Sequence, residues 1–265
     1  MTKFCTFASG SAGNASFLSS GTTHLLIDMG ISCRRICASL SRIGMCAKDL
    51  SAILITHYHG DHIGGLATYI KKYTTPIITT SATADQLSLR FPGIISRIKC
   101  VDLGEQCVIG DVTVTVLPTS HDCKGSCAFY IATPEGTVGY ITDTGMIPQE
   151  TAQMLLGTEL LVLESNHDIE MLCSGSYPYS IKERILGERG HLSNHMAANF
   201  AADSARAGTQ SIILAHLSAE NNTPQIARDT VREKLKAVGY CGYLSVAPEK
   251  DMSEVYTIGV SSCSV

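Results

Sequence analysis

Short apolar runs alternate with turn-forming residues along most of the chain. Runs of this kind, bounded by Gly, Pro, Ser and Thr, are typical of buried β-strands. The turn pairs Gly110-Asp111 and Glu135-Gly136 each stand between two such runs and predict hairpins. The pattern predicts strands at Lys3–Ala8, Ala15–Leu18, His24–Asp28, Ala52–Thr56, Pro76–Thr79, Cys107–Ile109, Val112–Leu117, Cys127–Ala132, Thr137–Thr142, Leu160–Leu163 and Ser211–Ala215.

Other segments carry apolar residues at helical spacing. Ser193 and Thr223 are typical N-cap residues, and a glycine follows several of these segments as a stop signal. The spacing predicts helices at Ser32–Arg42, Asp61–Lys72, Ser81–Arg90, Pro148–Leu156, Ser193–Ala207 and Pro224–Val238. Because strands arrive in hairpins as well as between helices, we expect a mixed α+β and α/β fold in which helices cover mixed sheets.

Composition places the chain among globular proteins. It has 265 residues, 45% hydrophobic and 17% charged, and no linker or repeat divides it, so we expect a single domain over residues 1–265. The start of the chain lacks the pattern of a signal peptide, and no apolar run is long enough to span a membrane. We therefore expect a cytoplasmic protein with no membrane partner. The 11 cysteines are an odd number and are expected to be reduced thiols.

The net charge of −4 gives the chain no overall basic character. Any contact with nucleic acid must therefore come from a local patch. The strongest candidates for contacts with phosphate are Lys182, Arg184 and Arg189. They lie in the sequence between Asn166 and His191, which are both expected near the functional site.

The densest group of chemically active side chains follows the strand Ala52–Thr56. On an extended segment residues i and i+2 share a face, so His57 and His59 point into one pocket. The turn at Gly60 then returns Asp61 and His62 toward the same space. Three imidazoles and one carboxylate within six residues form a nitrogen and oxygen ligand set that suits Zn, Mn or Fe.

Three later residues follow strands in a similar way. His121 comes after Val112–Leu117, Asp143 after Thr137–Thr142, and His216 directly after Ser211–Ala215. A lone histidine at a strand end is usually a surface residue. Together with the histidine cluster, however, these positions predict side chains that complete a metal site.

The order His57-x-His59-x-Asp61-His62, then His121, Asp143 and His216, resembles the metallo-β-lactamase superfamily. More narrowly, the segments Ala8–Asn14, Glu164–Asp168, Gly190–Asn194 and His216–Asn222 resemble the YycJ/WalJ family of metal-dependent nucleases. The resemblance implies an αβ/βα four-layer sandwich with a dinuclear metal site on one edge. About 73 residues separate Asp143 from His216, which leaves no room for a β-CASP insertion.

The family pattern also implies a role for each metal-site residue. His57, His59 and His121 would hold the first ion. Asp61, His62 and His216 would hold the second, and Asp143 would bridge both. Asp28 matches an early aspartate that orients the histidine loop, although a plain strand-end cap remains the alternative. The ions would be two divalent cations, Zn or Mn, with Fe a third option.

The resemblance further implies 5′-to-3′ exonuclease activity on DNA, with RNA as a second substrate. Hydroxide bridging the two ions would attack phosphorus, and Asp61 would orient it. His191 would be the general acid and Glu164 its orienter, unless His191 only binds phosphate or packs its loop. Asn14 and Asn221 would contact substrate, unless they serve only a hairpin turn and a helix cap.

Two other classes of function remain open at this point. The first is a small-molecule hydrolase on the same scaffold, a thioesterase, lactonase or cyclic phosphodiesterase, which the acidic net charge favours. The second is a metal- or redox-responsive binding protein, which the cysteines suggest. All seven expected ligands are present, and this favours an enzyme.

Overall fold

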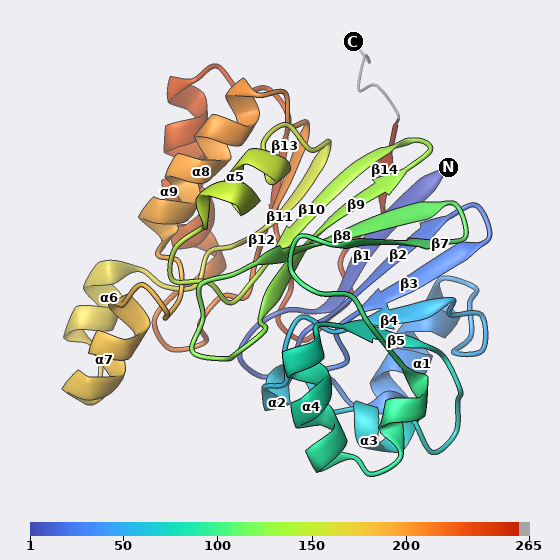
Figure 1. Cartoon of the computed structure of the whole chain (residues 1–265). Coiled ribbons are helices and arrows are strands. Elements are labelled where there is room, and N and C mark those ends of the chain that lie inside the picture. The colour runs from blue at the N-terminus through green and yellow to red at the C-terminus, as the bar shows by residue number, and fades with distance from the viewer. Residues whose placement is uncertain (260–265) are drawn as a thin grey trace.

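Two seven-stranded sheets lie face to face at the centre of the computed structural model, which describes residues 1–259 (Figure 1). The first sheet has the strand order β14-β1-β2-β3-β4-β5-β6 and the second β13-β12-β11-β10-β9-β8-β7. The first sheet consists of β1 Thr2–Ala8, β2 Ala15–Ser20, β3 Thr23–Ile27, β4 Ala52–Leu54, β5 Ile77–Thr79, β6 Ile98–Cys100 and β14 Tyr256–Ile258. The second consists of β7 Gln106–Ile109, β8 Val112–Pro118, β9 Cys127–Thr133, β10 Gly136–Ile141, β11 Leu160–Glu164, β12 Ser211–Ala215 and β13 Tyr243–Val246.

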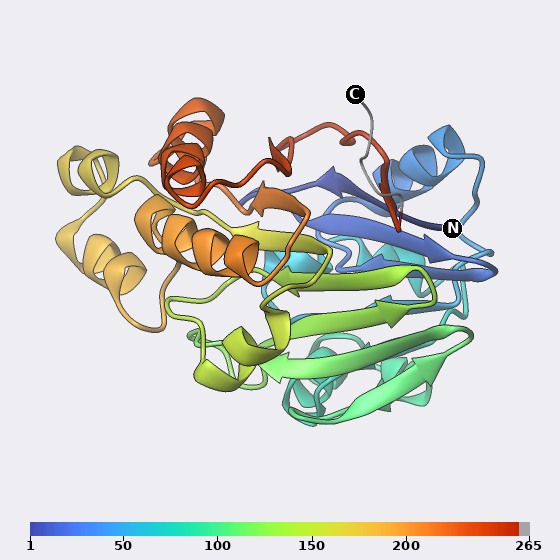
Figure 2. The same ribbon diagram turned by 90° about the horizontal axis from the view of Figure 1, so that it is seen from above.

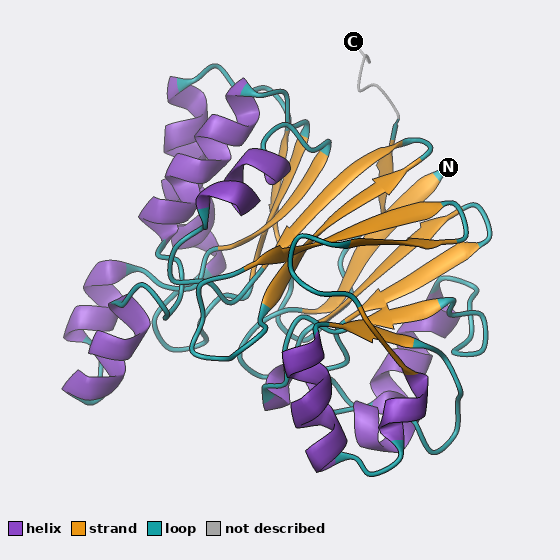
Figure 3. Ribbon diagram, in the orientation of Figure 1, coloured by secondary structure: helices purple, strands orange, loops and turns teal. Residues whose placement is uncertain are grey.

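Helices cover the outer face of each sheet, which makes four layers (Figures 1, 2 and 3). The first sheet carries α1 Cys33–Arg42, α3 Leu66–Tyr69, α4 Ser81–Arg90 and the short η1 Ile94–Arg97. The second carries α5 Gln149–Leu155, α8 Asn194–Arg206 and α9 Pro224–Ala237. The predicted αβ/βα sandwich is therefore confirmed. No helix among residues 1–259 combines the length and the apolar character needed to cross a bilayer.

Strands buried on both faces explain the continuous apolar runs in the sequence. In β3, Leu25 and Ile27 pack into the core between the sheets, whereas Leu26 packs under the helices of the first sheet. In β11, Leu160 and Val162 enter the same central core, and their neighbours pack against the helices of the second sheet. Alternate residues thus enter two different cores, which explains the unbroken apolar runs Leu25–Ile27 in β3 and Leu160–Leu163 in β11.

Most elements predicted from the sequence are present. Both predicted hairpins form, β7 with β8 and β9 with β10. Ser193 and Thr223 accept N-cap hydrogen bonds from Met196 and Ile226 as expected. The strands β6, β13 and β14 were not predicted, because three or four residues at a sheet edge carry little periodic signal.

The single helix predicted over Asp61–Lys72 is wrong. The structure has α2 Gly60–Ile63 and α3 Leu66–Tyr69, separated at Gly64 and Gly65. A Cβ atom at Gly65 would lie 2.2 Å from the carbonyl oxygen of Ile31, and one at Gly64 would lie 2.8 Å from that of Gly30. The loop after β3 therefore packs directly on this backbone, and the glycines serve that contact rather than a continuous helix.

A pair of short helices was also missed. α6 Ile169–Ser174 and α7 Tyr179–Leu186 form a hairpin that lies beyond the ends of the sheets instead of on a sheet face (Figures 1 and 2). Neither helix has the broad apolar face of a core helix. Asp168, whose side chain accepts a hydrogen bond from the Met171 amide, and Pro178 at the start of α7 were the local signals available.

The ten cysteines within residues 1–259 are free thiols. Five of them are buried, one is half-buried and four are exposed. Four of the buried cysteines pack as small apolar side chains in the core between the sheets or under the helices of the first sheet, as expected from the sequence.

Candidate metal centre

The loops that follow β3, β4, β8, β10, β11 and β12 bring the predicted site residues to one edge of the sandwich. Asp28 and His216 directly follow β3 and β12, and Asp143 lies two residues after β10; their φ angles are 59°, 55° and 55°, in the order Asp28, Asp143 and His216. They are the only residues other than glycine within 1–259 with a positive φ. A left-handed backbone is unfavourable for such residues and persists where surrounding contacts hold it, which is typical of functional sites.

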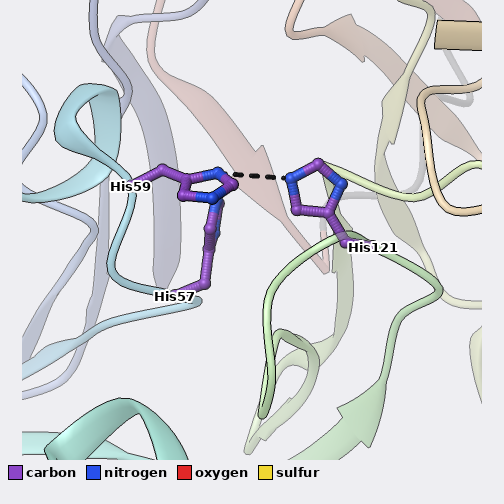
Figure 4. Close-up of side chains that lie close together, drawn as sticks. All are labelled: His57, His59 and His121. Carbon is purple, nitrogen blue, oxygen red and sulfur yellow. Dashed lines mark hydrogen bonds between the residues drawn. The ribbon is translucent and has the colours of Figure 1, made fainter. Parts of the chain in front are cut away.

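One group of donors comes from two loops that face each other across the edge. His57 and His59 follow β4, and His121 follows β8 (Figure 4). Each of the three offers a ring nitrogen within 4.8 Å of the others. His59 Nδ1 and His121 Nε2 are 3.3 Å apart, and their rings meet edge to face.

A second group of donors lies beside the first. Asp61, His62 and His216 also offer atoms that lie within 4.8 Å of one another. Asp61 Oδ2 is 3.4 Å from Nε2 of both histidines. Asp143 stands between the groups: Oδ2 is 3.1 Å from His62 Nε2, and Oδ1 is 3.9 Å from His121 Nε2.

The other ring nitrogen of these histidines is held by a second partner. Asp28 Oδ2 is 2.7 Å from His62 Nδ1, and Glu164 Oε1 is 2.9 Å from His216 Nδ1. The carbonyl oxygen of Gly190 is 3.2 Å from His121 Nδ1. Acceptors at Nδ1 select the tautomer that leaves Nε2 free and fix the direction of the ring, as is common for metal-binding histidines.

Burial and charge at this site fit bound cations. Asp28, Asp143 and Glu164 are at most 3% exposed, and the side chain of Asp61 is 25% exposed. Within residues 1–259, no Lys or Arg nitrogen lies within 4.0 Å of these four carboxylates, whose charged neighbours are all histidines. Buried negative charges need compensation, and divalent cations supply it.

The direction of the pKa shifts follows from the same arrangement. Burial disfavours the charged form of His216, but the carboxylates of Asp143, Asp61 and Glu164 outweigh burial and raise its pKa to about 10. Burial likewise opposes charge on His62, yet Asp143 and Asp28 hold its pKa well above the usual range. The neighbouring carboxylates thus favour the positively charged form of both imidazole rings.

His57 provides a complementary observation. Its side chain is 1% exposed, and its Nε2 atom has no hydrogen-bond partner among the described residues. Burial lowers its pKa well below the usual range, so the ring is neutral. A buried neutral imidazole with an unpartnered nitrogen is a suitable metal ligand. The donor set therefore fits divalent metal, although the seven ligand assignments stay predictions.

His191 and Glu164 lie next to each other at the same edge. His191 Nδ1 is 2.7 Å from Glu164 Oε1, and the His191 side chain is 16% exposed. Glu164 Oε2 accepts hydrogen bonds from the backbone amides of Thr144 and Leu192. Burial raises the pKa of Glu164, but His191 and His216 outweigh it and lower the pKa to about 2.

The predicted substrate residues Asn14 and Asn221 are 1% and 2% exposed. Asn14 Nδ2 is 3.1 Å from His62 Nε2 and 3.4 Å from Asp61 Oδ2, so its amide supports the donor loop. Asn221 Nδ2 donates to Ser218 Oγ at 3.5 Å. Their contact with substrate stays a prediction. The nearby residues Ser11 and Ser218 line the open cavity, whereas Asn14 and Asn221 are not among its lining residues.

That cavity has a volume of about 310 Å³ and opens onto the donor groups. Of the three basic residues singled out in the sequence, Arg184 lines it. Lys182 Nζ instead donates to the Cys173 carbonyl, and Arg189 Nε donates to the His121 carbonyl. The cavity is lined by Ser11, His59, Asp61, His121, Asp122, Asp143, Asn166, Tyr177, Ile181, Arg184, Ile185, His191, His216 and Ser218.

Asp122 and Tyr177 also line the cavity, although the sequence analysis did not predict them as site residues. Asp122 Oδ1 is 3.4 Å from His121 Nε2 and 3.6 Å from His59 Nε2, and Oδ2 pairs with Arg184 Nη1 at 3.0 Å. The position of Asp122 directly after His121 was a usable signal. Tyr177 lies in the connection between α6 and α7, which no sequence pattern placed near the site.

Comparison with known proteins gives a consistent result. Residues 23–217 match the family model of the β-lactamase superfamily domain. The chain is 35% identical over 238 residues to the exodeoxyribonuclease YycJ of Bacillus anthracis, covering 89% of this chain and 90% of the relative. It is 33% identical over 236 residues to the exodeoxyribonuclease WalJ of Streptococcus pneumoniae, covering 88% of each.

Solved structures agree on the architecture. The metallo-β-lactamase fold protein YhfI from Bacillus subtilis superimposes with a TM-score of 0.69 at 21% identity. The match covers 96% of this chain and all of that one. At this level of identity the likeness concerns the fold.

Proposed function

The chain belongs to the metallo-β-lactamase superfamily and, within it, to the YycJ/WalJ family, and from this premise we propose that it is a metal-dependent 5′-to-3′ exonuclease acting on DNA. The observation that carries the proposal is the meeting of seven nitrogen and oxygen donors at one sheet edge, beside an open cavity. Two relatives aligned over nearly nine tenths of the chain are named exodeoxyribonucleases, which supports the substrate class.

Two divalent ions, Zn or Mn with Fe as a third option, would be held by the two donor groups. His57, His59 and His121 would bind one ion, and Asp143 would bind both. The second ion would be bound by Asp61, His62 and His216. When bound, such ions lower the pKa of water toward about 7 and stabilise negative charge on phosphoryl oxygens.

The chain's own residues orient the ligands. Asp28 holds Nδ1 of His62 and in turn accepts hydrogen bonds from the backbone amide and the hydroxyl of Thr56. This arrangement supports a role for Asp28 as the residue that orients His62, beyond that of a strand-end cap. Asp61 is the most exposed of the four carboxylates and lines the cavity, which supports a role for it in orienting a nucleophilic water.

His191 is proposed as the general acid. Glu164 holds Nδ1 of His191, which leaves Nε2 to donate a proton to the leaving oxygen of the cleaved phosphodiester. Burial opposes a charge on His191, but Glu164 and Asp143 outweigh it and raise the pKa, which favours the protonated ring that a general acid requires. Proton donation of this kind contributes a factor of roughly 10²–10⁴ in rate.

The test is a cleavage assay on metal-reconstituted protein. End-labelled single- and double-stranded DNA and RNA are offered side by side, together with a thioester, a lactone and a cyclic phosphodiester. We expect mononucleotides released from the 5′ end of DNA, and no release by Asp61→Asn. Preferential hydrolysis of one of the small esters, with the oligonucleotides intact, would instead identify a small-molecule hydrolase.

Salt dependence supplies a second criterion. Binding of DNA through phosphate contacts releases counterions, so KM for DNA must rise steeply as salt is increased. A KM that is independent of salt would argue against a nucleic-acid substrate.

A further inference from the structure

The α6–α7 hairpin forms one wall of the cavity above the metal centre. Tyr177 lies in the connection between the two helices, and Ile181, Arg184 and Ile185 belong to α7. The remaining lining comes from the metal-centre loops and from Ser11, Asn166 and Ser218. The wall thus presents an aromatic ring, apolar side chains and one guanidinium to the same space as the donor groups.

This wall is attached to the metal centre at both of its ends. The amide of Asp168, just before α6, donates to the carbonyl of Asn221 at 2.9 Å. At the other end the amide of His191 donates to the carbonyl of Ile185, in α7, at 3.0 Å. The two helices are also tied together, because Lys182 Nζ donates to the Cys173 carbonyl at 2.7 Å. The hairpin therefore holds its side chains at a defined position relative to His191.

Arg184 is held at the mouth of the cavity by a weak partner. Its side chain is 57% exposed, and its pair with Asp122 at 3.0 Å is also partly exposed. Exposed ion pairs of this kind contribute little stability, so the guanidinium can exchange Asp122 for another anion. A guanidinium binds a phosphate through two parallel hydrogen bonds, which makes phosphate a strong competitor.

Tyr177 has the exposure of a contact residue. It is half-buried and lines the cavity, whereas Tyr179, two positions along the chain, is 76% exposed and does not. Aromatic side chains bind single-stranded nucleic acid by stacking on bases. A cavity of about 310 Å³ lies at the lower end of the range for sites that enclose one small molecule, so it matches a single nucleotide better than a longer stretch of strand.

We propose that Tyr177 and Arg184 form the subsite for the terminal nucleotide of single-stranded DNA, in which the Tyr177 ring stacks on the base and the Arg184 guanidinium binds the phosphate. This inference rests on the proposed nuclease function and adds to it the residues that select a nucleotide over a plain phosphodiester.

The experiment measures kcat and KM for two substrates with the full-length, metal-loaded protein. One is a single-stranded oligonucleotide, and the other is the same oligonucleotide with an abasic terminal position, which offers the phosphodiester but no ring to stack on. Tyr177→Ala is expected to raise KM for the oligonucleotide about 5- to 150-fold, which corresponds to stacking of about 1–3 kcal/mol. Tyr177→Phe and the matched control Tyr179→Ala are expected to leave it unchanged. Cleavage of the abasic oligonucleotide should be the same in all of these variants, because it has no terminal base to stack on Tyr177.

Two further measurements separate stacking from a structural effect. The ratio of KM between the abasic and the complete oligonucleotide should fall toward one in Tyr177→Ala, because stacking requires the base. Arg184→Gln should lower the slope of log KM against log salt by about one, whereas Arg206→Gln, an exposed arginine paired with Asp203 on α8, should not. Fluorescence anisotropy with the inactive Asp61→Asn protein checks that the changes are in binding.

The outcomes distinguish the two proposals. A wild-type protein that cleaves neither substrate overturns the nuclease assignment itself. A wild type that degrades DNA, with Tyr177→Ala and Tyr179→Ala indistinguishable from it, overturns the subsite and leaves the nuclease assignment intact. Equal loss by Tyr177→Ala on both phosphodiesters would also overturn the subsite, because it would show a general disturbance of the metal centre.

Discussion

Glu164 Oε1 lies 2.7 Å from Nδ1 of His191, and the same oxygen lies 2.9 Å from Nδ1 of His216. One buried carboxylate oxygen therefore orients both the proposed general acid and a proposed metal ligand. Its partner oxygen is held by two backbone amides, so the carboxylate cannot turn freely. The proton donor and the metal site are consequently fixed relative to each other through a single side chain.

The general-acid role predicts a dependence on the leaving group. His191→Ala should lower kcat on DNA by roughly 10²–10⁴, because the leaving alkoxide then lacks a proton donor. The loss on bis(p-nitrophenyl) phosphate should be far smaller, because nitrophenolate leaves without a proton. Steady-state kinetics on both substrates checks this, with the exposed His195→Ala as control. Equal losses on both substrates would mean that His191 does not act as the acid.

The contact between Asp28 and His62 predicts an effect on metal affinity. Asp28→Asn removes the charge that holds Nδ1 of His62 and should weaken metal binding by about 10- to 100-fold. Asparagine tolerates the left-handed backbone at this position, so the fold should persist. Competition against a chromogenic chelator measures the affinity. An unchanged affinity in a folded variant would reduce Asp28 to a strand-end cap.

Close backbone packing predicts that alanine substitutions at Gly30 and at Gly60 differ sharply in their effect on stability. A Cβ at Gly30 would lie 1.7 Å from the carbonyl oxygen of Asp61 and 2.5 Å from the amide nitrogen of Asn14. Gly30→Ala should therefore displace the donor loop and cost about 1–3 kcal/mol of stability, together with metal affinity. Gly60→Ala has nothing within 4 Å and should be close to neutral. Urea unfolding compares the two, and similar midpoints would contradict the packing argument.

Buried carboxylates without Lys or Arg partners predict that metal supports the fold. Metal at 100 times its dissociation constant contributes about 2.7 kcal/mol to the free energy of unfolding, and each kcal/mol shifts Tm by about 2–4 °C in a domain of 150–250 residues. Chelation should thus lower Tm by several degrees. Asp143→Asn should show a smaller drop on chelation. Identical melting curves with and without chelator would contradict the binding of cations at this site.

The lowered pKa of His167 predicts that the free energy of unfolding decreases in mild acid. Burial lowers its pKa to about 4, below the 6.5 of an unperturbed histidine. Between these values the unfolded chain binds the proton and the folded chain does not, so stability is complete above pH 6.5 and is lost as pH falls toward 4. The full loss is about 3 kcal/mol. His167→Asn should remove it, seen as a smaller difference between urea midpoints at pH 7 and pH 4.5.

Local sequence determined most of the strands and the outer helices. Burial of alternate residues in two cores leaves an unbroken apolar run such as Leu25–Ile27, which is readable without any tertiary information. The short spacing from His57 to His62 likewise placed several donors on one segment. The short edge strands β6, β13 and β14 were not predicted, because three or four residues supply too little periodicity.

What only the tertiary structure decided was which side chains face the same space. Glu164 and His216 meet across 52 positions of sequence, and Arg184 and Asp122 across 62. Asn14 belongs to a glycine-rich turn in the sequence, but packing buries its amide against Asp61 and His62. The physical reason is the distance along the sequence over which each kind of information extends. Periodicity reports burial over a few residues, whereas encounters between distant loops depend on strand order and on backbone angles at strand ends, such as the left-handed Asp28, Asp143 and His216.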